Sequence, residues 1–176
     1  MARRARGRDG GARRRAASAA TERRLSADGT YVAVVGRGDA SPYELHAAHE
    51  IGSRLAELGA LVVCGGLGGV MEAACRGAKE SSGTTLGLLP GTDRRAANPH
   101  VDVAVPTGLG EARNALVVRA ADGVIAVGGA YGTLSEIALA LKAGKPVVAL
   151  SSWEIDGVVA ASSPADAVDK VLYPLA

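Results

Sequence analysis

Residues 61–80 read LVVCGGLGGVMEAACRGAKE, and this stretch decides the fold. Leu61–Cys64 is a short apolar run typical of a buried strand, and the glycine-rich residues 65–69 follow it at once. A segment with helical spacing then runs from Val70 to about Lys79. A strand that passes through glycines directly into a helix is typical of the β-α-β units of parallel sheets.

The same alternation continues on both sides of this stretch. Tyr31–Gly36 is an apolar run, and Ser41-Pro42-Tyr43-Glu44 predicts a helix start with a capping box between Ser41 and Glu44. Further strands are expected at Thr85–Leu89, Val101–Val105, Val124–Val127 and Pro146–Leu150, with an edge strand at Val158–Ala161. Further helices are expected at Glu111–Ala121, Leu134–Ala143 and Ser163–Leu172. The pattern predicts an α/β protein with a single doubly wound, Rossmann-like parallel sheet and helices on both faces.

The composition excludes several classes of protein. No apolar run approaches the ~20 residues that cross a bilayer, so no membrane partner is expected. Cys64 and Cys75 lie inside apolar segments without metal-ligand spacing, which predicts buried free thiols and a cytoplasmic location. The three histidines have no companion ligands nearby in the sequence, so neither a metal site nor a resident cofactor is expected.

Charge divides the chain into two parts. Residues 1–24 contain nine arginines against Asp9 and Glu22, a net charge of +7, whereas the chain as a whole carries +2. We expect residues 1–28 to form a disordered Arg-rich tail and residues 29–176 to form one nucleotide-binding domain. The tail is interpreted as a solvated extension, a targeting sequence or a nucleic-acid tether. The domain itself is acidic, so nucleic acid is not its expected partner.

The glycine-rich turn after the second strand is the first candidate binding element. Gly65, Gly66 and Gly68 lead into the helix that begins near Met71, where exposed backbone N–H groups suit an anion. The alternative is that these glycines serve only the tight turn. Gly36, at the end of the first strand, belongs to a Gly-x-Gly that lacks the third glycine of the dinucleotide fingerprint.

A second candidate follows the strand Val124–Val127. Residues 128–136 read GGAYGTLSE, again between a strand and a helix. One interpretation is a capping box in which Thr133 caps the helix and Glu136 sits at its third position. The other is a phosphate site with an acidic group beside the sugar, formed by Gly129, Ala130, Tyr131, Gly132 and Thr133 with Glu136.

The third candidate is Arg113, with Asn114 after it, in the first turns of an otherwise apolar helix. An arginine at the edge of a buried helix serves either a structural ion pair or an anionic ligand, and the spacing leaves both open.

Four segments together resemble the LOG (LONELY GUY) family of nucleotide-binding Rossmann proteins, over roughly residues 30–161. They are GGLGGVMEAACRGA, LGLLPG, GEARNALVVRAAD and GGAYGTLSE. The resemblance implies a phosphoribohydrolase that cleaves the N-glycosidic bond of AMP or a cytokinin riboside 5′-monophosphate. It assigns the catalytic pair to Arg113 and Glu136.

Three positions depart from the family pattern. Gly128 stands where the family has proline, Ala130 where it has its second glycine, and Asn114 where it has lysine. These departures resemble the branch that contains molybdenum cofactor carrier proteins, which bind a phosphorylated pterin. The resemblance to the family implies a protein that binds a nucleoside 5′-monophosphate and hydrolyses it, whereas the three departures weaken the inference of hydrolysis. The alternative is a non-catalytic molybdenum cofactor carrier or a nucleotide sensor.

Two of the expected helices predict self-association. Ala112–Ala121 and Leu134–Ala143 carry apolar residues on more faces than a sheet can cover. A homo-oligomer, at least a dimer, is expected to bury these helices.

Overall fold

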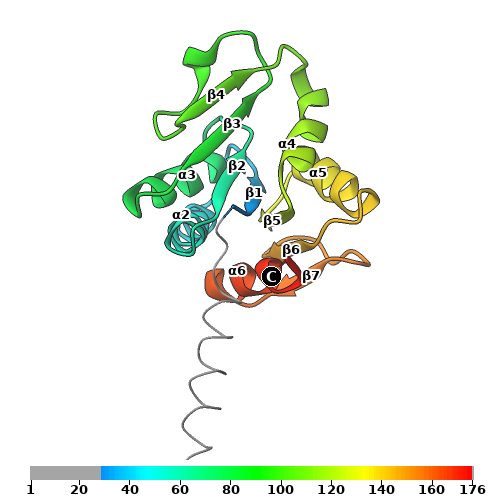
Figure 1. The fold of residues 1–176 in the computed structure, drawn as a ribbon. Helices are drawn as coiled ribbons and strands as arrows, with labels where there is room; N and C mark the ends of the chain where they lie inside the picture. The colour runs from blue at the N-terminus through cyan, green and yellow to red at the C-terminus, as the bar shows by residue number, and fades with distance from the viewer. Residues whose placement is uncertain (1–28, 176) are drawn as a thin grey trace, which may run out of the picture.

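The computed structural model describes residues 29–175 as one seven-stranded sheet covered by helices (Figure 1). The predicted tail, residues 1–28, lies outside the described residues. The strands are β1 (Tyr31–Gly36), β2 (Leu61–Cys64), β3 (Thr85–Leu89), β4 (Val103–Pro106), β5 (Gly123–Val127), β6 (Val147–Leu150) and β7 (Val159–Ala161). The α-helices are α2 (Pro42–Glu57), α3 (Val70–Glu80), α4 (Asn114–Ala120), α5 (Tyr131–Lys142) and α6 (Pro164–Leu172). Short 3₁₀ turns occupy Arg94–Ala96, Gly110–Arg113 and Tyr173–Leu175.

The sheet confirms the predicted doubly wound fold. Its strand order is β4-β3-β2-β1-β5-β6-β7, and every neighbouring pair is parallel. The chain moves outward from β1 to β4, then returns to place β5 against the other side of β1. The order therefore reverses between β1 and β5, which is where open α/β sheets bind ligands, beyond the carboxyl ends of the strands.

Two apolar cores lie on opposite faces of the sheet. Successive residues of β1 alternate between them: Val32 and Val34 pack in the core with α2, α3 and α6, while Ala33 and Val35 pack in the core with α4 and α5. This alternation follows from the period of two along a strand. Valine and alanine fill most of both cores.

The helix that follows β1 begins as the sequence predicted. The Ser41 hydroxyl accepts the Glu44 N–H, and the Glu44 carboxylate accepts the Ser41 N–H, which completes the capping box. At α6 the Ser163 hydroxyl likewise accepts the Asp166 N–H. The edge strand β7 is also confirmed, one residue shorter than predicted.

Other predicted bounds need correction. β4 starts at Val103 rather than Val101, because the Val101 N–H closes a turn onto the Asn98 carbonyl and the Asp102 N–H donates to the Thr85 hydroxyl instead of to a strand carbonyl. The helix expected over 111–121 divides into the 3₁₀ turn Gly110–Arg113 and the shorter α4.

The capping box predicted between Thr133 and Glu136 is wrong. Helix α5 begins at Tyr131, three residues earlier than expected, and its N-cap is Ala130 in an extended conformation. Alanine has no side-chain acceptor, so no side chain caps α5. The first backbone N–H groups of α5 therefore remain available to a ligand.

No helix within residues 29–175 is both long and apolar enough to span a bilayer.

Candidate functional site

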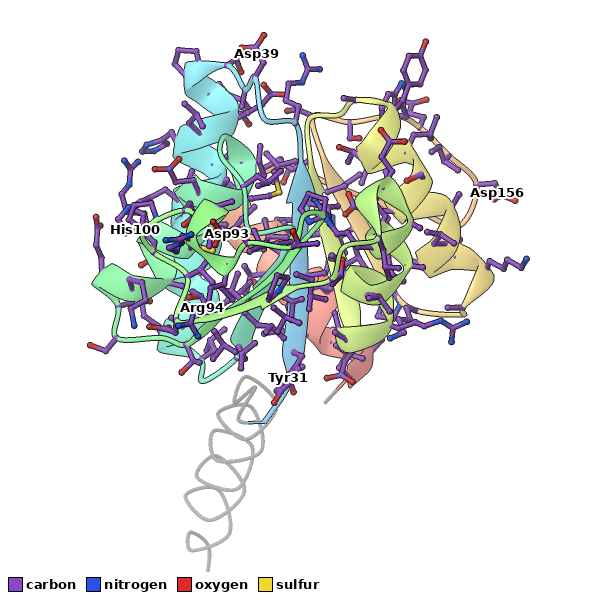
Figure 2. All side chains as sticks on the ribbon, turned by 90° about the horizontal axis from the view of Figure 1, so that it is seen from above. Tyr31, Asp39, Asp93, Arg94, His100 and Asp156 are labelled. Carbon is purple, nitrogen blue, oxygen red and sulfur yellow. The ribbon has the colours of Figure 1, made fainter. Side chains whose placement is uncertain are left out.

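A cleft of about 650 Å³ opens beyond the carboxyl ends of β1 and β5, at the switch point of the sheet. Figure 2 shows Asp39, which lies at the cleft, at the opposite end of β1 from Tyr31. The volume falls within the range of small-molecule and cofactor sites. Its walls come from five separate segments, each at the end of a strand or the start of a helix. They are Gly36–Asp39, Leu67 with Met71, Pro90, Gly110–Asn114 except Ala112, and residues 129–136 except Tyr131, Leu134 and Ser135.

The cleft brings together most of the predicted site residues. Arg113 and Glu136 are 23 positions apart in the chain, yet their side chains meet in its wall. The other predicted residues that line it are Gly36, Met71, Asn114, Gly129, Ala130, Gly132 and Thr133. Their roles in binding stay predictions.

Four predicted residues do not line the cleft. Gly65 lies beneath the Arg113 guanidinium, so close that a Cβ there would collide with it. Gly66 adopts a φ of +76° and its carbonyl accepts the Asn98 N–H, so it serves the turn. Gly68 also lies outside the lining, and Tyr131 is 88% exposed on the first turn of α5. The tight-turn interpretation thus accounts for Gly66, while Gly65 permits the close approach of the Arg113 guanidinium. A role of these glycines in binding stays a prediction.

Arg113 and Glu136 form a buried ion pair. Arg113 Nη1 lies 3.6 Å from Glu136 Oε1 and donates a 3.0 Å hydrogen bond to Asn114 Oδ1. Within residues 29–175 the buried Arg113 Nε has no hydrogen-bond partner. Burial raises the pKa of Glu136 to about 7, although the Arg113 charge acts to lower it. A carboxyl group with this pKa gains or loses a proton near neutral pH, as catalytic carboxyl groups do.

Asn114 links this pair to the start of α5. Its side-chain N–H donates to Ser135 Oγ at 3.0 Å, and the Ser135 hydroxyl donates to the Gly132 carbonyl at 2.7 Å. The amide therefore connects the Arg113 side of the cleft to the glycine-rich turn. A lysine at position 114 would donate but would not accept the bond from Arg113.

The departure at Gly128 also has a structural reason. Gly128 has a φ of +61°, which proline cannot adopt, and a Cβ at this position would collide with the Glu44 carboxylate. The glycine lets the β5 turn approach the N-terminus of α2. The turn is thus built differently from one with proline at the same place.

Sequence reasoning did not assign Arg37, Gly38, Asp39, Leu67, Pro90, Gly110 or Glu111 to the site, although all of them line the cleft. Of the loop over residues 90–100, Pro90 alone lines the cleft. Arg94 and His100, farther along that loop, lie apart from Asp39 (Figure 2).

The two cysteines lie behind the cleft in the wall that carries Met71. Both are free and buried, as predicted, and their sulfur atoms are 3.4 Å apart. The hydrogen bond from Cys75 lowers the pKa of the Cys64 thiol, and the same bond raises the pKa of Cys75. Within residues 29–175 no group of three or more His, Cys, Asp or Glu residues could hold a metal ion.

The fold and the cleft together define a Rossmann-like α/β protein with a cleft of small-molecule size at the switch point of its sheet. The chain belongs to the SLOG cluster4 family, whose model matches residues 29–173. This confirms the predicted kinship with LOG-like Rossmann proteins.

The chain is similar to proteins that handle the molybdenum cofactor. It is 38% identical to the molybdenum cofactor binding protein of Rippkaea orientalis, with a TM-score of 0.80 over 84% of this chain and 98% of that one. It is 36% identical to the Moco carrier protein of Chlamydomonas reinhardtii, with a TM-score of 0.76 over 84% and 99% of the two chains. An uncharacterized protein of Archaeoglobus fulgidus is 40% identical over 139 residues, which are 78% of this chain and 91% of that protein.

Proposed function

We propose that the cleft binds a phosphorylated pterin of the molybdenum cofactor kind, and that the protein carries this ligand without converting it. The uncapped start of α5 supports this proposal most directly. The start of this helix lies at the cleft, which Gly129, Gly132 and Thr133 line, and no side chain caps it. Such a turn, with the positive end of the helix dipole, suits a phosphate group. The similarity to proteins described as binding or carrying the molybdenum cofactor supplies the ligand class.

The remaining walls suit a flat heterocycle. Leu67, Met71 and Pro90 form an apolar side of the cleft, opposite the polar turn of α5. Asp39 and Glu111 lie at the cleft and offer carboxylate acceptors. A pterin presents ring N–H groups that can donate to such acceptors, while its faces contact apolar side chains.

The test is direct loading. Protein purified from cells that make the molybdenum cofactor is analysed for molybdenum by mass spectrometry and for pterin by fluorescence after oxidation. We expect both in a fixed ratio to protein, and we expect Gly132→Asp, which puts a carboxylate at the phosphate turn, to abolish both. Protein that contains neither, and that does not take up the cofactor in vitro, contradicts the proposal.

A phosphoribohydrolase is the second candidate, favoured by the pKa of Glu136 near 7 and its contact with Arg113. Cleavage of the bond between ribose C1′ and the base builds positive charge on the sugar, which an ionised Glu136 would stabilise. A guanidinium group does not act as an acid near neutral pH, so Arg113 would position Glu136 rather than donate a proton. Base release from AMP should then rise with pH through about 7 and vanish in Glu136→Gln. Absence of base release from AMP and from cytokinin riboside monophosphates rules this candidate out.

We further propose that the protein is a cytoplasmic homodimer. Leu109 and Leu116, before and within α4, are exposed, and Leu134, Leu139 and Leu141 of α5 are only half-buried. A second copy would cover these side chains. Light scattering at micromolar concentration should give twice the monomer mass, and a monomer would contradict this assembly.

A further inference from the structure

Two arginines line the cleft, and the structure gives them different surroundings. Arg113 is 8% exposed. Its guanidinium lies against Gly65 and faces Glu136 and Asn114. Its charge is therefore engaged by Glu136, and its position is fixed by the backbone beneath it. An arginine held in this way positions a carboxyl group and has little freedom to follow a ligand.

Arg37 lies on the turn after β1, and its side chain is 43% exposed. Its Nη2 donates to the Gly129 carbonyl, and its Nε lies 3.5 Å from Glu44 Oε1. The side chain thus reaches from the β1 turn to the β5 turn across the switch point. A guanidinium has five N–H donors, so these two contacts leave donors on both terminal nitrogens for a ligand.

The carbonyl that Arg37 contacts belongs to the turn proposed for the phosphate. Gly129 directly precedes Ala130, the N-cap of α5, and both residues line the cleft beside Arg37. A phosphate bound to the first N–H groups of α5 would lie next to the Arg37 guanidinium. Asp39 and Glu111 also lie at the cleft, and their negative charge would oppose a phosphate unless a cation is close.

We propose that Arg37 binds the ligand phosphate and so fixes the orientation of the ligand, with its ring toward Leu67, Met71 and Pro90. This assignment rests on the proposed function, and it separates the two arginines by role. Arg37 binds the phosphate in bidentate fashion, as guanidinium groups do, and Arg113 positions Glu136. Because Arg37 is already partly exposed, a phosphate would bind it at a small additional cost of desolvation.

The test compares each ligand with its own dephosphorylated form. A fluorescent 6-substituted pterin phosphate and the same pterin after phosphatase treatment are titrated against the parent, Arg37→Met and Arg37→Lys. AMP and adenosine form a second pair, measured by calorimetry. Arg95→Met is the matched control, because Arg95 is 86% exposed and pairs with Asp93 outside the cleft lining.

We expect Arg37→Met to weaken the phosphorylated ligands about 10- to 100-fold and to leave the dephosphorylated forms within about twofold of the parent. Arg37→Lys, which keeps the charge but loses the bidentate geometry, should recover part of this loss, and Arg95→Met should match the parent. The urea unfolding midpoints of all variants show whether loss of the Gly129 contact destabilises the protein.

Equal weakening of both members of a pair would overturn the assignment, since it would mean that Arg37 acts by shaping the turn. Unchanged binding of the phosphorylated form would overturn it as well, while leaving the proposed function intact. If the parent itself does not prefer the phosphorylated members, the proposed phosphate site is wrong, and the assignment of Arg37 fails with it.

Discussion

Glu136 and Asp102 each face a basic side chain, but their surroundings shift the two pKa values in opposite directions. Glu136 lies 3.6 Å from Arg113 in the cleft, and burial raises its pKa to about 7. Asp102 lies 2.7 Å from Lys79 at the edge of the sheet. Partial burial acts to raise the pKa of Asp102, but hydrogen bonds from Lys79 and Thr85 outweigh it and hold that pKa below its usual range.

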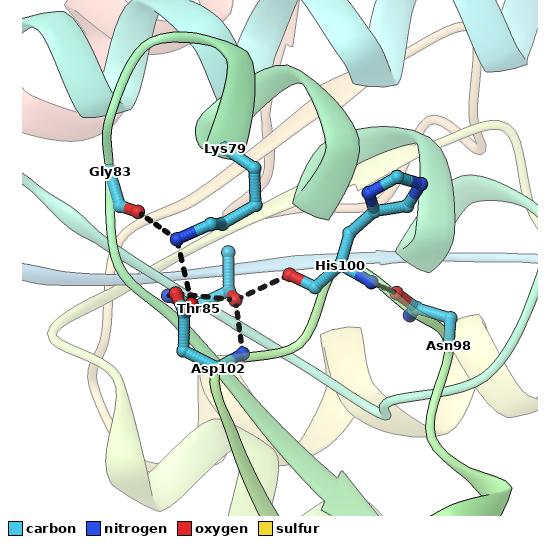
Figure 3. Close-up of polar contacts among 6 residues, drawn as sticks. All are labelled: Lys79, Gly83, Thr85, Asn98, His100 and Asp102. Carbon is cyan, nitrogen blue, oxygen red and sulfur yellow. Dashed lines mark hydrogen bonds and ion pairs between the residues drawn. The ribbon is translucent and has the colours of Figure 1, made fainter.

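The difference lies in how completely each group is hydrogen-bonded. Asp102 accepts the Thr85 N–H, the Thr85 hydroxyl and the Lys79 ammonium, while its own N–H donates to Thr85 Oγ1 (Figure 3). The single proton of the Thr85 hydroxyl is shared between Asp102 Oδ2 at 3.1 Å and the His100 carbonyl at 2.7 Å, so Thr85 also holds the β3–β4 connection in place. In the cleft, by contrast, Arg113 Nε is buried without a partner among the described residues. The Asp102 cluster satisfies its polar groups, whereas the cleft pair leaves a buried donor without a partner in the described part of the chain.

The largest effect is expected from Arg113→Met, which removes the cation from the cleft pair. At pH 9 the ionised Glu136 would be left buried without a partner, so the free energy of unfolding should fall by about 3–5 kcal/mol. At pH 5 Glu136 is protonated, and the loss should be clearly smaller. Urea unfolding at both pH values measures this. An equal loss at pH 5 and pH 9 would show that Arg113 acts through packing alone.

The next largest effect is the pH dependence of the free energy of unfolding that arises from Glu136 itself. Its pKa is about 7 in the folded protein and 4.5 in the reference state. Because the folded value is the higher one, the stabilisation is complete below pH 4.5 and is lost as pH rises through 7. The loss is on the order of 3 kcal/mol. Asp102, with its lowered pKa, contributes in the opposite sense and loses its contribution at acid pH.

Glu136→Gln isolates this contribution. The difference in unfolding free energy between the parent and the variant should change by on the order of 3 kcal/mol between pH 4.5 and pH 8, with the parent relatively weaker at pH 8. Asp102→Asn serves as the control, because the loss of unfolding free energy between pH 4.5 and pH 8 should remain in this variant. A parent and Glu136→Gln with parallel profiles would mean that Glu136 is ionised throughout.

For the cleft, much of the fold and of the site could be predicted from the sequence. Apolar runs and glycine-rich turns predicted the strands and placed the site at their carboxyl ends. The resemblance to LOG proteins paired Arg113 with Glu136 across 23 residues, and the structure brings the two side chains together. Local patterns succeed here because each strand is buried on both faces and each turn needs its glycines.

The rest depends on which segments become neighbours in space. Nothing local to Thr85 or Asp102 indicates that the register of β3 and β4 places them in contact. Arg37 contacts the Gly129 carbonyl because β5 pairs with β1, which brings the turns after these two strands together. The residues around Arg37 do not indicate this pairing. The capping box at Thr133 failed for a local reason: α5 starts directly after the Gly128-Gly129-Ala130 turn, before Thr133 is reached.

A smaller effect is expected from Asp102→Ala. This change leaves the N–H of the fully buried Thr85 without its acceptor, while the Thr85 hydroxyl can still donate to the His100 carbonyl. The free energy of unfolding should fall by about 2 kcal/mol, since each buried polar group without a partner costs about 1–3 kcal/mol. Ligand affinity should not change, because Asp102 does not line the cleft. A loss of affinity comparable to that of a cleft variant would show that the two regions are coupled.

The smallest effect is expected from Lys79→Met, the counterpart of Arg113→Met at the sheet edge. Lys79 is 38% exposed, and it donates to Asp102 and to the Gly83 carbonyl. Removal of its charge should cost less than about 1 kcal/mol, because solvent screens the pair and Thr85 continues to donate to Asp102. Urea unfolding of both variants at pH 9 tests the contrast, with Lys142→Met on the exposed end of α5 as the control for loss of a lysine. If Lys79→Met cost as much as Arg113→Met, burial would not be what distinguishes the two pairs.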